Sequence, residues 1–550
     1  MSDVQSRRRA LEARHPVWRE RTLAQALDDA AERHPGRPLI LTAEREWTYS
    51  DVVAWSRRLA AGLVSRGAEA GDHVAIVMAN YPEFVALKFA IARAGAVAVP
   101  INFLLKRDEL AYVLEQSNAS VLVTMDRFRD LDYLAALDAV HDRLPRLREV
   151  VVFSTDGAER LAQLEVSDAS ALAEVDRRVA AGDPRCNADI IYTSGTSGRP
   201  KGVMLTHDML LRSAYGSAWT RAFQDGRRIL FALPLYHVFS YVEGMLAALF
   251  AGGAIVPQTV FDPVATLRAV EEFAVDEALF VPTMTIAVLE AARAGSYDVS
   301  SLQTVMSAAA PAPVRLWQAL RDELGVREIL TAYGMTETAA ATTFTQPDGP
   351  LELVATTVGT PKRGAGAGDP LVSYKTVDPL TGEDLPAGEE GELAARGLIV
   401  GHGYYNKPAE TAEVLDAEGW LRSGDLGRID ADGNVLLTGR SKELYKCGGE
   451  LVAPKEVEEC LSSHPAVAQA YVVGVRDERM GEVGCAWVVA DPGMPAPPEP
   501  EELIDWCRPR LARFKVPVHV MYLEAGELPT TATGKVQKFR LIERAEAVMA

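Results

Sequence analysis

The stretch YTSGTSGRPKG (192–202) carries residue types that bind phosphate. Its glycine, serine and threonine residues let backbone N–H groups approach a ligand closely and form an anion-binding nest. The hydroxyl groups add hydrogen-bond donors, and Lys201 adds a positive charge. The stretch matches neither a Walker A loop nor a nucleophile elbow. Taken alone, it fits either a phosphate-binding loop or a flexible connection.

Three further stretches combine glycine with charged or hydroxyl-bearing residues: YGMTET (333–338), RSGDLGRIDADGNVLLTGRSKELYKCGGE (422–450) and PTTATGKVQK (529–538). With the 192–202 stretch they resemble, in the same order along the chain, the signature motifs of the adenylate-forming superfamily. This superfamily includes acyl-CoA synthetases, peptide-synthetase adenylation domains and beetle luciferases. The resemblance extends over nearly the whole chain and favours the acyl-CoA ligase branch, which decides for a phosphate-binding loop at 192–202.

The resemblance implies a nucleotide site. The phosphates of ATP would contact Thr193, Ser194, Gly195, Thr196, Ser197, Gly198 and Lys201. The AMP part would contact Ala309, Ala310, Pro311, Tyr333, Gly334, Met335, Thr336, Asp425 and Arg440. Tyr333 would stack on adenine, Asp425 would accept the ribose hydroxyls, and Glu337 would hold Mg²⁺. Lys535 would bridge the substrate carboxylate and the α-phosphate, and it joins Lys201, Thr336 and Glu337 as an implied catalytic residue.

The same resemblance implies where the acid and coenzyme A bind. The acid pocket would include His237, Val238, Ser307, Ala308 and Gly334. Coenzyme A would pass Lys446, Gly448 and Gly449, and Lys442 would be the hinge of a mobile C-terminal domain. That domain would present Lys535 for the first step and the Gly448–Gly449 face for the second.

Two features depart from the superfamily's pattern. SAAAPAP places Ala308 where glycine is frequent, and its methyl group would narrow the acyl pocket or disfavour a strained φ. The stretch 358–379 is longer than usual and contains a glycine run. Both features lie near the expected nucleotide and acyl groups, so they bear on the efficiency of the adenylation step.

The leading hypothesis is an ATP-dependent acyl-CoA ligase, an AMP-forming acid–thiol ligase, that activates a hydrophobic carboxylic acid. Adenylation brings two anions together, so positioned cations suffice and no base need act on the ionised acid. In LPLYHVFSYVEGM the one acidic residue is Glu243, which disfavours an α-amino acid substrate. Two alternatives stay open: a ligase that mainly converts a supplied acyl-adenylate to the thioester, and an acyl-AMP ligase that loads a carrier protein.

The elements that position these residues follow from the hydrophobic pattern. From about residue 22 to 340, buried strand-like runs alternate with amphipathic helical stretches, which predicts helix-covered parallel sheets. After about residue 350, dense turn signals predict β-rich structure, which the resemblance identifies as a distorted β-barrel. A small α+β unit follows. We therefore expect an α/β protein with a large domain at 1–440 and a small mobile domain at 441–550.

Composition limits the partners. The formal net charge of −19 disfavours a nucleic-acid binder, and five cysteines without metal-ligand spacing fit a reducing cytoplasm. The N-terminus lacks the apolar run of a signal peptide, and no apolar stretch is long enough to span a membrane. The resemblance implies a small carboxylic acid, ATP, Mg²⁺ and coenzyme A as the partners. We expect a cytoplasmic protein that is a monomer or a homodimer.

Overall fold

The computed structural model describes residues 3–155, 160–193, 199–310, 312–448, 450–491, 493–494, 496–530 and 536–549. The chain divides into two compact units. The first is Met1–Ser373 with Ala395–Leu421, and the second is Tyr374–Ala394 with Arg422–Ala550. The predicted boundary between residues 440 and 441 lies within the second unit. Its role as a hinge stays a prediction.

In the described part of the first unit, seven strands form a sheet in the order β15-β14-β13-β11-β12-β1-β2. Their bounds are β15 (Glu328–Leu330), β14 (Thr304–Ser307), β13 (Glu277–Phe280), β11 (Arg228–Phe231), β12 (Ala254–Pro257), β1 (Pro38–Leu41) and β2 (Glu46–Thr48). All neighbours pair in parallel except β1 and β2. The apolar runs RILF, AIVP and EALF thus form buried central strands, as predicted.

A second sheet of the same unit has the order β10-β9-β4-β3-β5-β8 among the described residues. Its strands are β10 (Lys201–Thr206), β9 (Asn187–Thr193), β4 (Val97–Pro100), β3 (His73–Val77), β5 (Val121–Met125) and β8 (Glu149–Phe153). Pairing is parallel from β9 to β8, whereas β10 runs antiparallel to β9. The stretch 192–202 therefore runs from β9 to β10, the two strands of a hairpin at the edge of the sheet.

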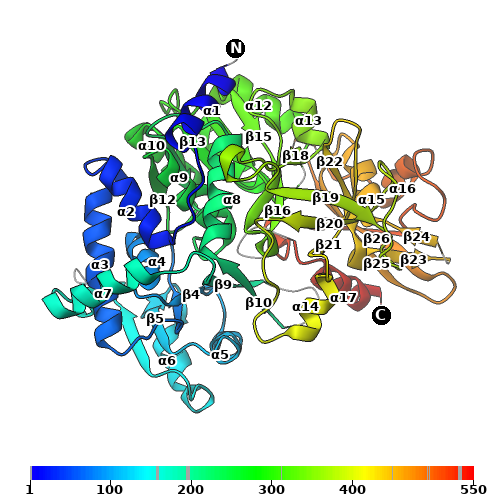
Figure 1. Cartoon of the computed structure of the whole chain (residues 1–550). Coiled ribbons are helices and arrows are strands. Elements are labelled where there is room, and N and C mark those ends of the chain that lie inside the picture. The colour runs from blue at the N-terminus through cyan, green and yellow to red at the C-terminus, as the bar shows by residue number, and fades with distance from the viewer. Residues whose placement is uncertain are drawn as a thin grey trace. The chain divides into compact units, whose positions relative to one another are not determined.

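Helices accompany these sheets in the first unit, which confirms the predicted mixed α/β class. They are α1 (Asp3–Arg14), α2 (Leu23–Arg33), α3 (Tyr49–Ser65), α4 (Pro82–Arg93), α5 (Arg107–Gln116), α6 (Tyr133–Asp138), α7 (Ala169–Ala181), α8 (His207–Thr220), α9 (Ala247–Phe250), α10 (Pro263–Phe273), α11 (Pro282–Ala294), α12 (Val314–Leu324), α13 (Leu351–Thr356) and α14 (Pro408–Val414). Helices α2, α3, α4 and α7 pack together (Figure 1). Thr206 ends β10 and caps α8, because its hydroxyl accepts the amide of Met209 at 3.2 Å.

The β-rich region after residue 331 forms two smaller sheets. One is antiparallel: β16 (Ala332–Met335), β17 (Ala340–Phe344) and β18 (Thr360–Pro361). The other has the order β19 (Val372–Val377), β20 (Gly391–Gly397), β21 (Leu421–Ile429) and β22 (Val435–Arg440). The YGMTET motif spans β16 and the turn that leads to β17, so its geometry depends on that pair of strands.

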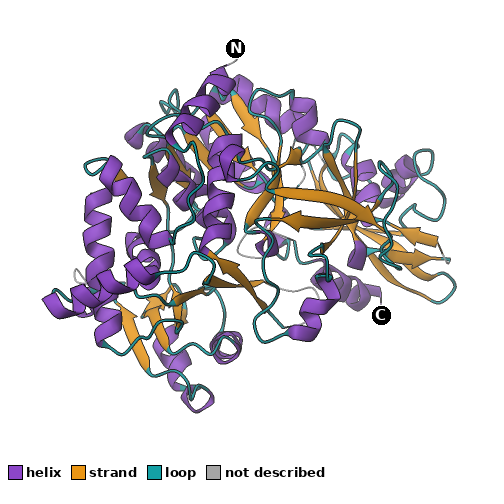
Figure 2. Ribbon diagram, viewed as in Figure 1, coloured by secondary structure: helices purple, strands orange, loops and turns teal. Residues whose placement is uncertain are grey.

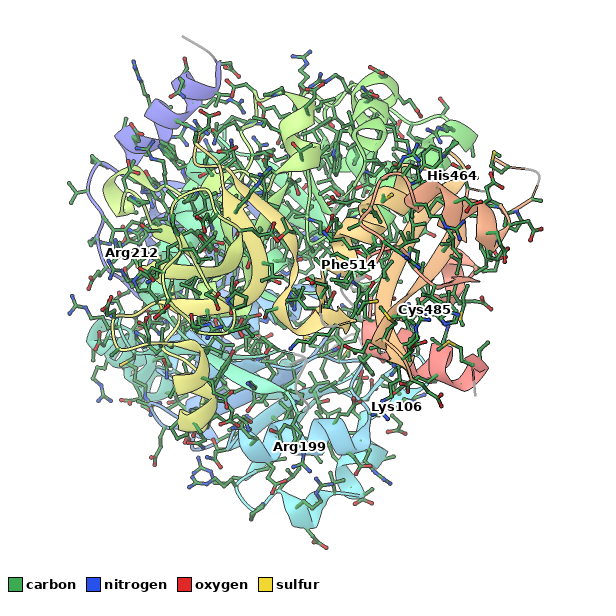
Figure 3. The ribbon with its side chains drawn as sticks, turned by 90° about the vertical axis from the view of Figure 1, so that its right-hand side faces the viewer. Lys106, Arg199, Arg212, His464, Cys485 and Phe514 are labelled. Atoms are coloured by element: carbon green, nitrogen blue, oxygen red, sulfur yellow. The ribbon has the colours of Figure 1, made fainter. Side chains whose placement is uncertain are left out.

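The rest of the second unit is α+β, as predicted. Its sheet contains β23 (Tyr445–Cys447), β24 (Glu450–Val452), β25 (Val467–Asp477), β26 (Gly481–Ala490) and β27 (His519–Tyr522). Helices α15 (Pro454–Ser462), α16 (Pro500–Cys507) and α17 (Lys538–Met549) accompany it (Figure 2). Cys485 is buried in the core of this unit and Phe514 packs against that core; both are labelled in Figure 3.

All five cysteines are free thiols. The sequence likewise predicts no disulfide framework. Within the described ranges, no helix has the length and apolar character needed to cross a bilayer.

Candidate active site

The two ends of the phosphate-loop stretch face each other across the edge hairpin. Thr193 is the last residue of β9, and its Cα partner is Lys201, the first residue of β10. Gly202 pairs with Tyr192, and a Cβ on Gly202 would lie 2.6 Å from Ile190 Cγ2. Glycine is therefore required after Lys201. The intervening predicted residues, Ser194, Gly195, Thr196, Ser197 and Gly198, lie outside the described part of the chain.

Tyr404 links the phosphate-loop cation to the predicted metal carboxylate. The Nζ atom of Lys201 lies 4.9 Å from the centroid of the Tyr404 ring, and the Tyr404 hydroxyl donates a 2.9 Å hydrogen bond to Glu337 Oε1. Burial and the charge of Glu337 raise the pKa of Tyr404, so its hydroxyl keeps its proton and donates. Lys201 and Glu337, predicted from separate motifs, thus share one intermediary.

A short segment before α14 places Tyr404 there. It runs beside β10: the Tyr405 amide donates to Gly202 O at 2.8 Å, and the Met204 amide donates to Gly403 O at 3.0 Å. The Gly401 amide also donates to Glu337 O at 2.7 Å. Sequence reasoning missed this segment, although the pattern GHGYYN at 401–406, with its adjacent tyrosines between turn residues, is visible.

The YGMTET motif forms β16 and a single turn at Thr336–Thr338. Tyr333 and Thr336 are buried, whereas Gly334 is exposed. A Cβ on Gly334 would lie 2.0 Å from Ala340 O, so no side chain fits at this position. Met335 is half-buried and pairs with Ala340. The close approach of β17 fixes the path of the backbone through the motif.

The predicted acid-side residues lie in two places of the first unit. His237 is half-buried, and its Nδ1 accepts the Phe239 amide at 3.3 Å; Val238 is buried beside it. A π-helical segment, Phe239–Leu246, follows. π-Helical segments are rare in proteins, and those that occur are often found at functional sites. Ser307 ends β14, is buried, and shares a 3.0 Å hydrogen bond with the hydroxyl of Thr285.

The structure corrects the expected position of strain in SAAAPAP. Ala308 is buried and continues the strand, since its amide donates to Phe280 O at 3.2 Å. The left-handed backbone is at Ala309, with φ +72°, where the chain leaves the strand. Ala309 and Ala310 are exposed, and Pro311 lies outside the described residues. The methyl group that matters for backbone strain is therefore that of Ala309, whereas Ala308 has an ordinary φ.

Asp425 and Arg440 form an ion pair within the second unit. They are Cα partners on β21 and β22, with Arg440 Nε 2.9 Å from Asp425 Oδ1. Asp425 is buried, and its amide donates to the Ser423 hydroxyl at 3.1 Å. Asp425 and Arg440, both expected to contact the nucleotide, are thus neighbours. A carboxylate that accepts a hydrogen bond from a guanidinium group can still accept hydrogen bonds from ribose hydroxyls.

The turn that contains the predicted hinge residue is bonded to Lys538, the last residue of the stretch PTTATGKVQK. Lys442 belongs to the turn Ser441–Glu443. Lys538 Nζ lies 2.7 Å from carboxylate oxygens of both Glu443 and Glu458, so it joins this turn to α15 and α17. Lys535, the predicted catalytic lysine, lies outside the described residues.

The expected coenzyme A face is only partly described. Lys446 is exposed on β23. Gly448 has φ +62°, and a Cβ there would lie 2.6 Å from Met480 Cε, so the turn needs glycine. Gly449 lies outside the described part. Cys447, between Lys446 and Gly448, is buried. Burial raises the pKa of its thiol, which disfavours the thiolate form that a nucleophile needs.

The residues present fit a Mg²⁺ ion carried in by ATP. Among the described residues, no group of three or more histidine, cysteine or acidic side chains could hold a metal alone. Mg²⁺ typically binds one or two carboxylates together with substrate phosphates and water. Glu337, on the turn after β16 and linked to Lys201 through Tyr404, offers such a carboxylate.

Known proteins resemble this chain over most of its length. The family profile described as AMP-binding enzyme matches residues 27–405, and that described as AMP-binding enzyme C-terminal domain matches residues 456–535. A Mycobacterium tuberculosis CoA ligase for a propanoyl group bearing a methyl-dioxo-octahydroindenyl ring is 35% identical, covering 95% of this chain and 99% of its own.

Solved structures match over the same length. ATP-bound MatB from Rhodopseudomonas palustris superposes with a TM-score of 0.82 at 28% identity, over 96% of this chain and 100% of its own. The anthranilate CoA ligase AuaEII in complex with anthranoyl-AMP gives a TM-score of 0.82 at 25% identity, over 98% and 100%.

Proposed function

Because the chain belongs to the AMP-binding enzyme family, in its acyl-CoA ligase branch, we propose that it activates a hydrophobic carboxylic acid. It is an AMP-forming acid–thiol ligase that uses ATP and proceeds through an acyl-adenylate. The arrangement that carries the assignment is the contact chain Lys201–Tyr404–Glu337, which joins the phosphate loop to the YGMTET turn. It brings a cation and a carboxylate to the same tyrosine, and a nucleoside triphosphate with its metal ion would need both charges.

In the first step a carboxylate oxygen of the acid attacks the α-phosphorus of ATP, and the bond to pyrophosphate breaks. Lys201 would neutralise the leaving phosphates, while Thr193 and the residues that follow it would bind them. Mg²⁺, when bound, supplies further charge neutralisation, and Glu337 would hold it. Lys535 would bring the carboxylate and the α-phosphate together and stabilise charge on the oxygens between them.

The second unit would hold the ribose and then deliver coenzyme A. Asp425, oriented by Arg440, would accept the ribose hydroxyls. In the second step the thiol sulfur attacks the acyl carbon, the bond to AMP breaks, and the thiol proton passes to solvent. Lys442 would be the hinge between the two steps. Lys446, Gly448 and Gly449 would line the path of the pantetheine chain.

A hydrophobic acid is favoured by the contacts of Glu243. This carboxylate is buried and bonded to Lys362, Ser217 and the Ala341 amide, so it is committed to the protein and not to a substrate ammonium group. The acid pocket is then formed by groups such as Val238, Ser307 and Ala308, which suit an aryl, fatty or polycyclic acid. We further propose a cytoplasmic enzyme, consistent with its free thiols.

A panel of fatty, aryl and polycyclic acids and amino acids tests the function. We expect acid-dependent pyrophosphate release and, with coenzyme A, a thioester detected by mass spectrometry, for hydrophobic acids only. Absence of both products across the panel would contradict the assignment. Turnover of synthetic acyl-AMP without any turnover of acid plus ATP would instead support a ligase restricted to the thioester step. Acyl-AMP that accumulates with coenzyme A present would point to a carrier-protein acceptor.

A further inference from the structure

A buried ion pair between Glu243 and Lys362 is connected by hydrogen bonds to the chain that follows the YGMTET motif. Glu243 comes from the π-helical segment and Lys362 from the chain after β18, and both side chains are fully buried. Lys362 Nζ is 3.5 Å from Glu243 Oε1. Because burying two charges is costly, such a pair stabilises a structure only when further hydrogen bonds satisfy both partners. Those further bonds lead to the active-site turn.

Glu243 bonds to the strand that follows the motif. Its Oε1 accepts the amide of Ala341 on β17 at 3.0 Å, and its Oε2 accepts the hydroxyl of Ser217 on α8. Arg221, the residue after the last residue of α8, lies 3.6 Å from Oε2 but pairs with Glu277 as well. Since Arg221 is shared between two carboxylates, Lys362 supplies a second positive charge for Glu243.

Lys362 reaches the same turn through α8. Its Nζ donates to the carbonyl and hydroxyl oxygens of Ser213, at 3.1 and 2.9 Å. The Ser213 hydroxyl in turn donates to Ala339 O at 2.6 Å. The Lys362 amide also donates to Thr342 O at 2.6 Å. Lys362 therefore contacts β17 directly through its backbone and the preceding turn through Ser213.

The turn held in this way has an unfavourable backbone. Ala339 and Ala340 have φ values of +51° and +90°, in the left-handed region that disfavours residues with a Cβ. Each such residue costs on the order of 1 kcal/mol or more and persists only when its surroundings hold it. Ala339 follows Glu337 by two residues, and Ala340 O lies against Gly334. A relaxed turn would thus displace the residues on both sides, including Thr336 and Glu337.

We propose that Lys362 and Glu243 are positioning residues for ATP: through Ser213 and the Ala341 amide they hold the Ala339–Ala340 turn and so aim Thr336 and Glu337 at the nucleotide. This inference rests on the proposed function, because it assigns the pair to the nucleotide side of that site. The pair joins four segments: α8, β17, the π-helical segment and the stretch 358–379, which contains Lys362. The longer stretch thereby contributes the lysine that completes the cluster.

The test compares Mg·ATP affinity, measured by calorimetry, with acid-dependent pyrophosphate exchange. We expect Lys362→Met and Glu243→Ala to weaken Mg·ATP binding about tenfold, the equivalent of one lost hydrogen bond of ordinary strength. Glu243→Gln should stay within about threefold of wild type, because an amide oxygen still accepts from Ala341. Mg·ATP affinity close to wild type in Glu243→Gln would show that residue 243 acts by holding the Ala341 amide in position and not by its charge alone.

A matched control removes a buried cation elsewhere. Arg93 on α4 is buried, pairs with Asp28 and donates to the Ser56 hydroxyl at 2.9 Å. We expect Arg93→Met to lower the Tm while leaving the Kd for Mg·ATP unchanged. An equal loss of affinity in Arg93→Met, or wild-type affinity in both Lys362→Met and Glu243→Ala, would overturn the proposal.

A double variant covers the case in which the single variants do not fold, and the activity of the wild type tests the proposed function separately. If the single variants do not fold, Lys362→Met with Glu243→Gln removes both charges together, which buried pairs tolerate better than the loss of one. That double variant lacks the donor to Ser213 and should still bind Mg·ATP about tenfold more weakly than wild type; wild-type affinity would contradict positioning. A wild-type protein that binds ATP but makes no acyl-AMP or thioester would contradict the proposed function, while the affinities would still decide the role of the pair.

Discussion

Tyr404 shows how a single hydroxyl can couple two motifs. Its ring lies against Lys201 Nζ, and its hydroxyl donates to Glu337. A carboxylate that accepts a fixed hydrogen bond keeps one orientation, and this orientation would matter in the proposed role of Glu337 as a ligand of Mg²⁺. Because Tyr404 is buried, water cannot readily replace its hydrogen bond to Glu337, and the loss of this bond costs free energy.

We expect Tyr404→Phe to lower kcat/KM for ATP in pyrophosphate exchange by about tenfold, since a hydrogen bond to a charged group is worth about 1.5–3 kcal/mol and water replaces part of it. The phenyl ring still covers Lys201, so the change isolates the hydroxyl. Tyr405→Phe is the control, because the Tyr405 hydroxyl accepts from Asn118 Nδ2 at 3.2 Å and faces a different partner. Equal rates for wild type and Tyr404→Phe would show that the bond does not serve adenylation.

At the scale of elements, Lys362 is where α8, β17 and the π-helical segment meet. Its ammonium group bonds to α8, its amide bonds to β17, and Glu243 faces it from the π-helical segment. Burial lowers the pKa of Lys362 from the usual 10.5 to about 8; Glu243 partly opposes this shift, whereas Arg221 adds to it. The protonated form that pairs with Glu243 is therefore lost at a mildly alkaline pH.

This pKa predicts that Mg·ATP affinity falls as pH rises through about 8 in the wild type and that Lys362→Met lacks this step. The fall is not caused by unfolding. Between about pH 8 and 10.5 the unfolded chain binds more protons at this lysine than the folded chain, so this group makes the free energy of unfolding rise with pH there. Calorimetric titrations at several pH values, each with a thermal melt, check both trends. An identical pH profile in the two proteins would contradict the assignment.

At the scale of the whole chain, the local features were predictable and the long-range contacts were not. Short apolar runs predict the strands of both mainly parallel sheets, and Gly202 and Gly334 stand where their surroundings leave no room for a Cβ. The contacts of Tyr404 with Glu337 and of Lys362 with Glu243 join residues 67 and 119 positions apart. No periodicity or spacing in one sequence reports such pairs, because they depend on how separate elements pack. For the same reason the strain was expected at Ala308, whereas the end of the strand places it at Ala309.

The two half-reactions of the whole enzyme should depend differently on Lys535. If Lys535 serves only adenylation, Lys535→Ala should lower acyl-AMP formation by about 100-fold or more, as expected when a group that stabilises transition-state charge is removed. The Kd for ATP should stay within about twofold, and synthetic acyl-AMP plus coenzyme A should still give the thioester, because that step needs no attack on phosphorus. Lys515→Ala is the control: Lys515 belongs to the same unit and pairs with Glu456 at 2.6 Å. An unchanged rate of acyl-AMP formation, or an equal loss in both half-reactions, would remove Lys535 from its assigned role.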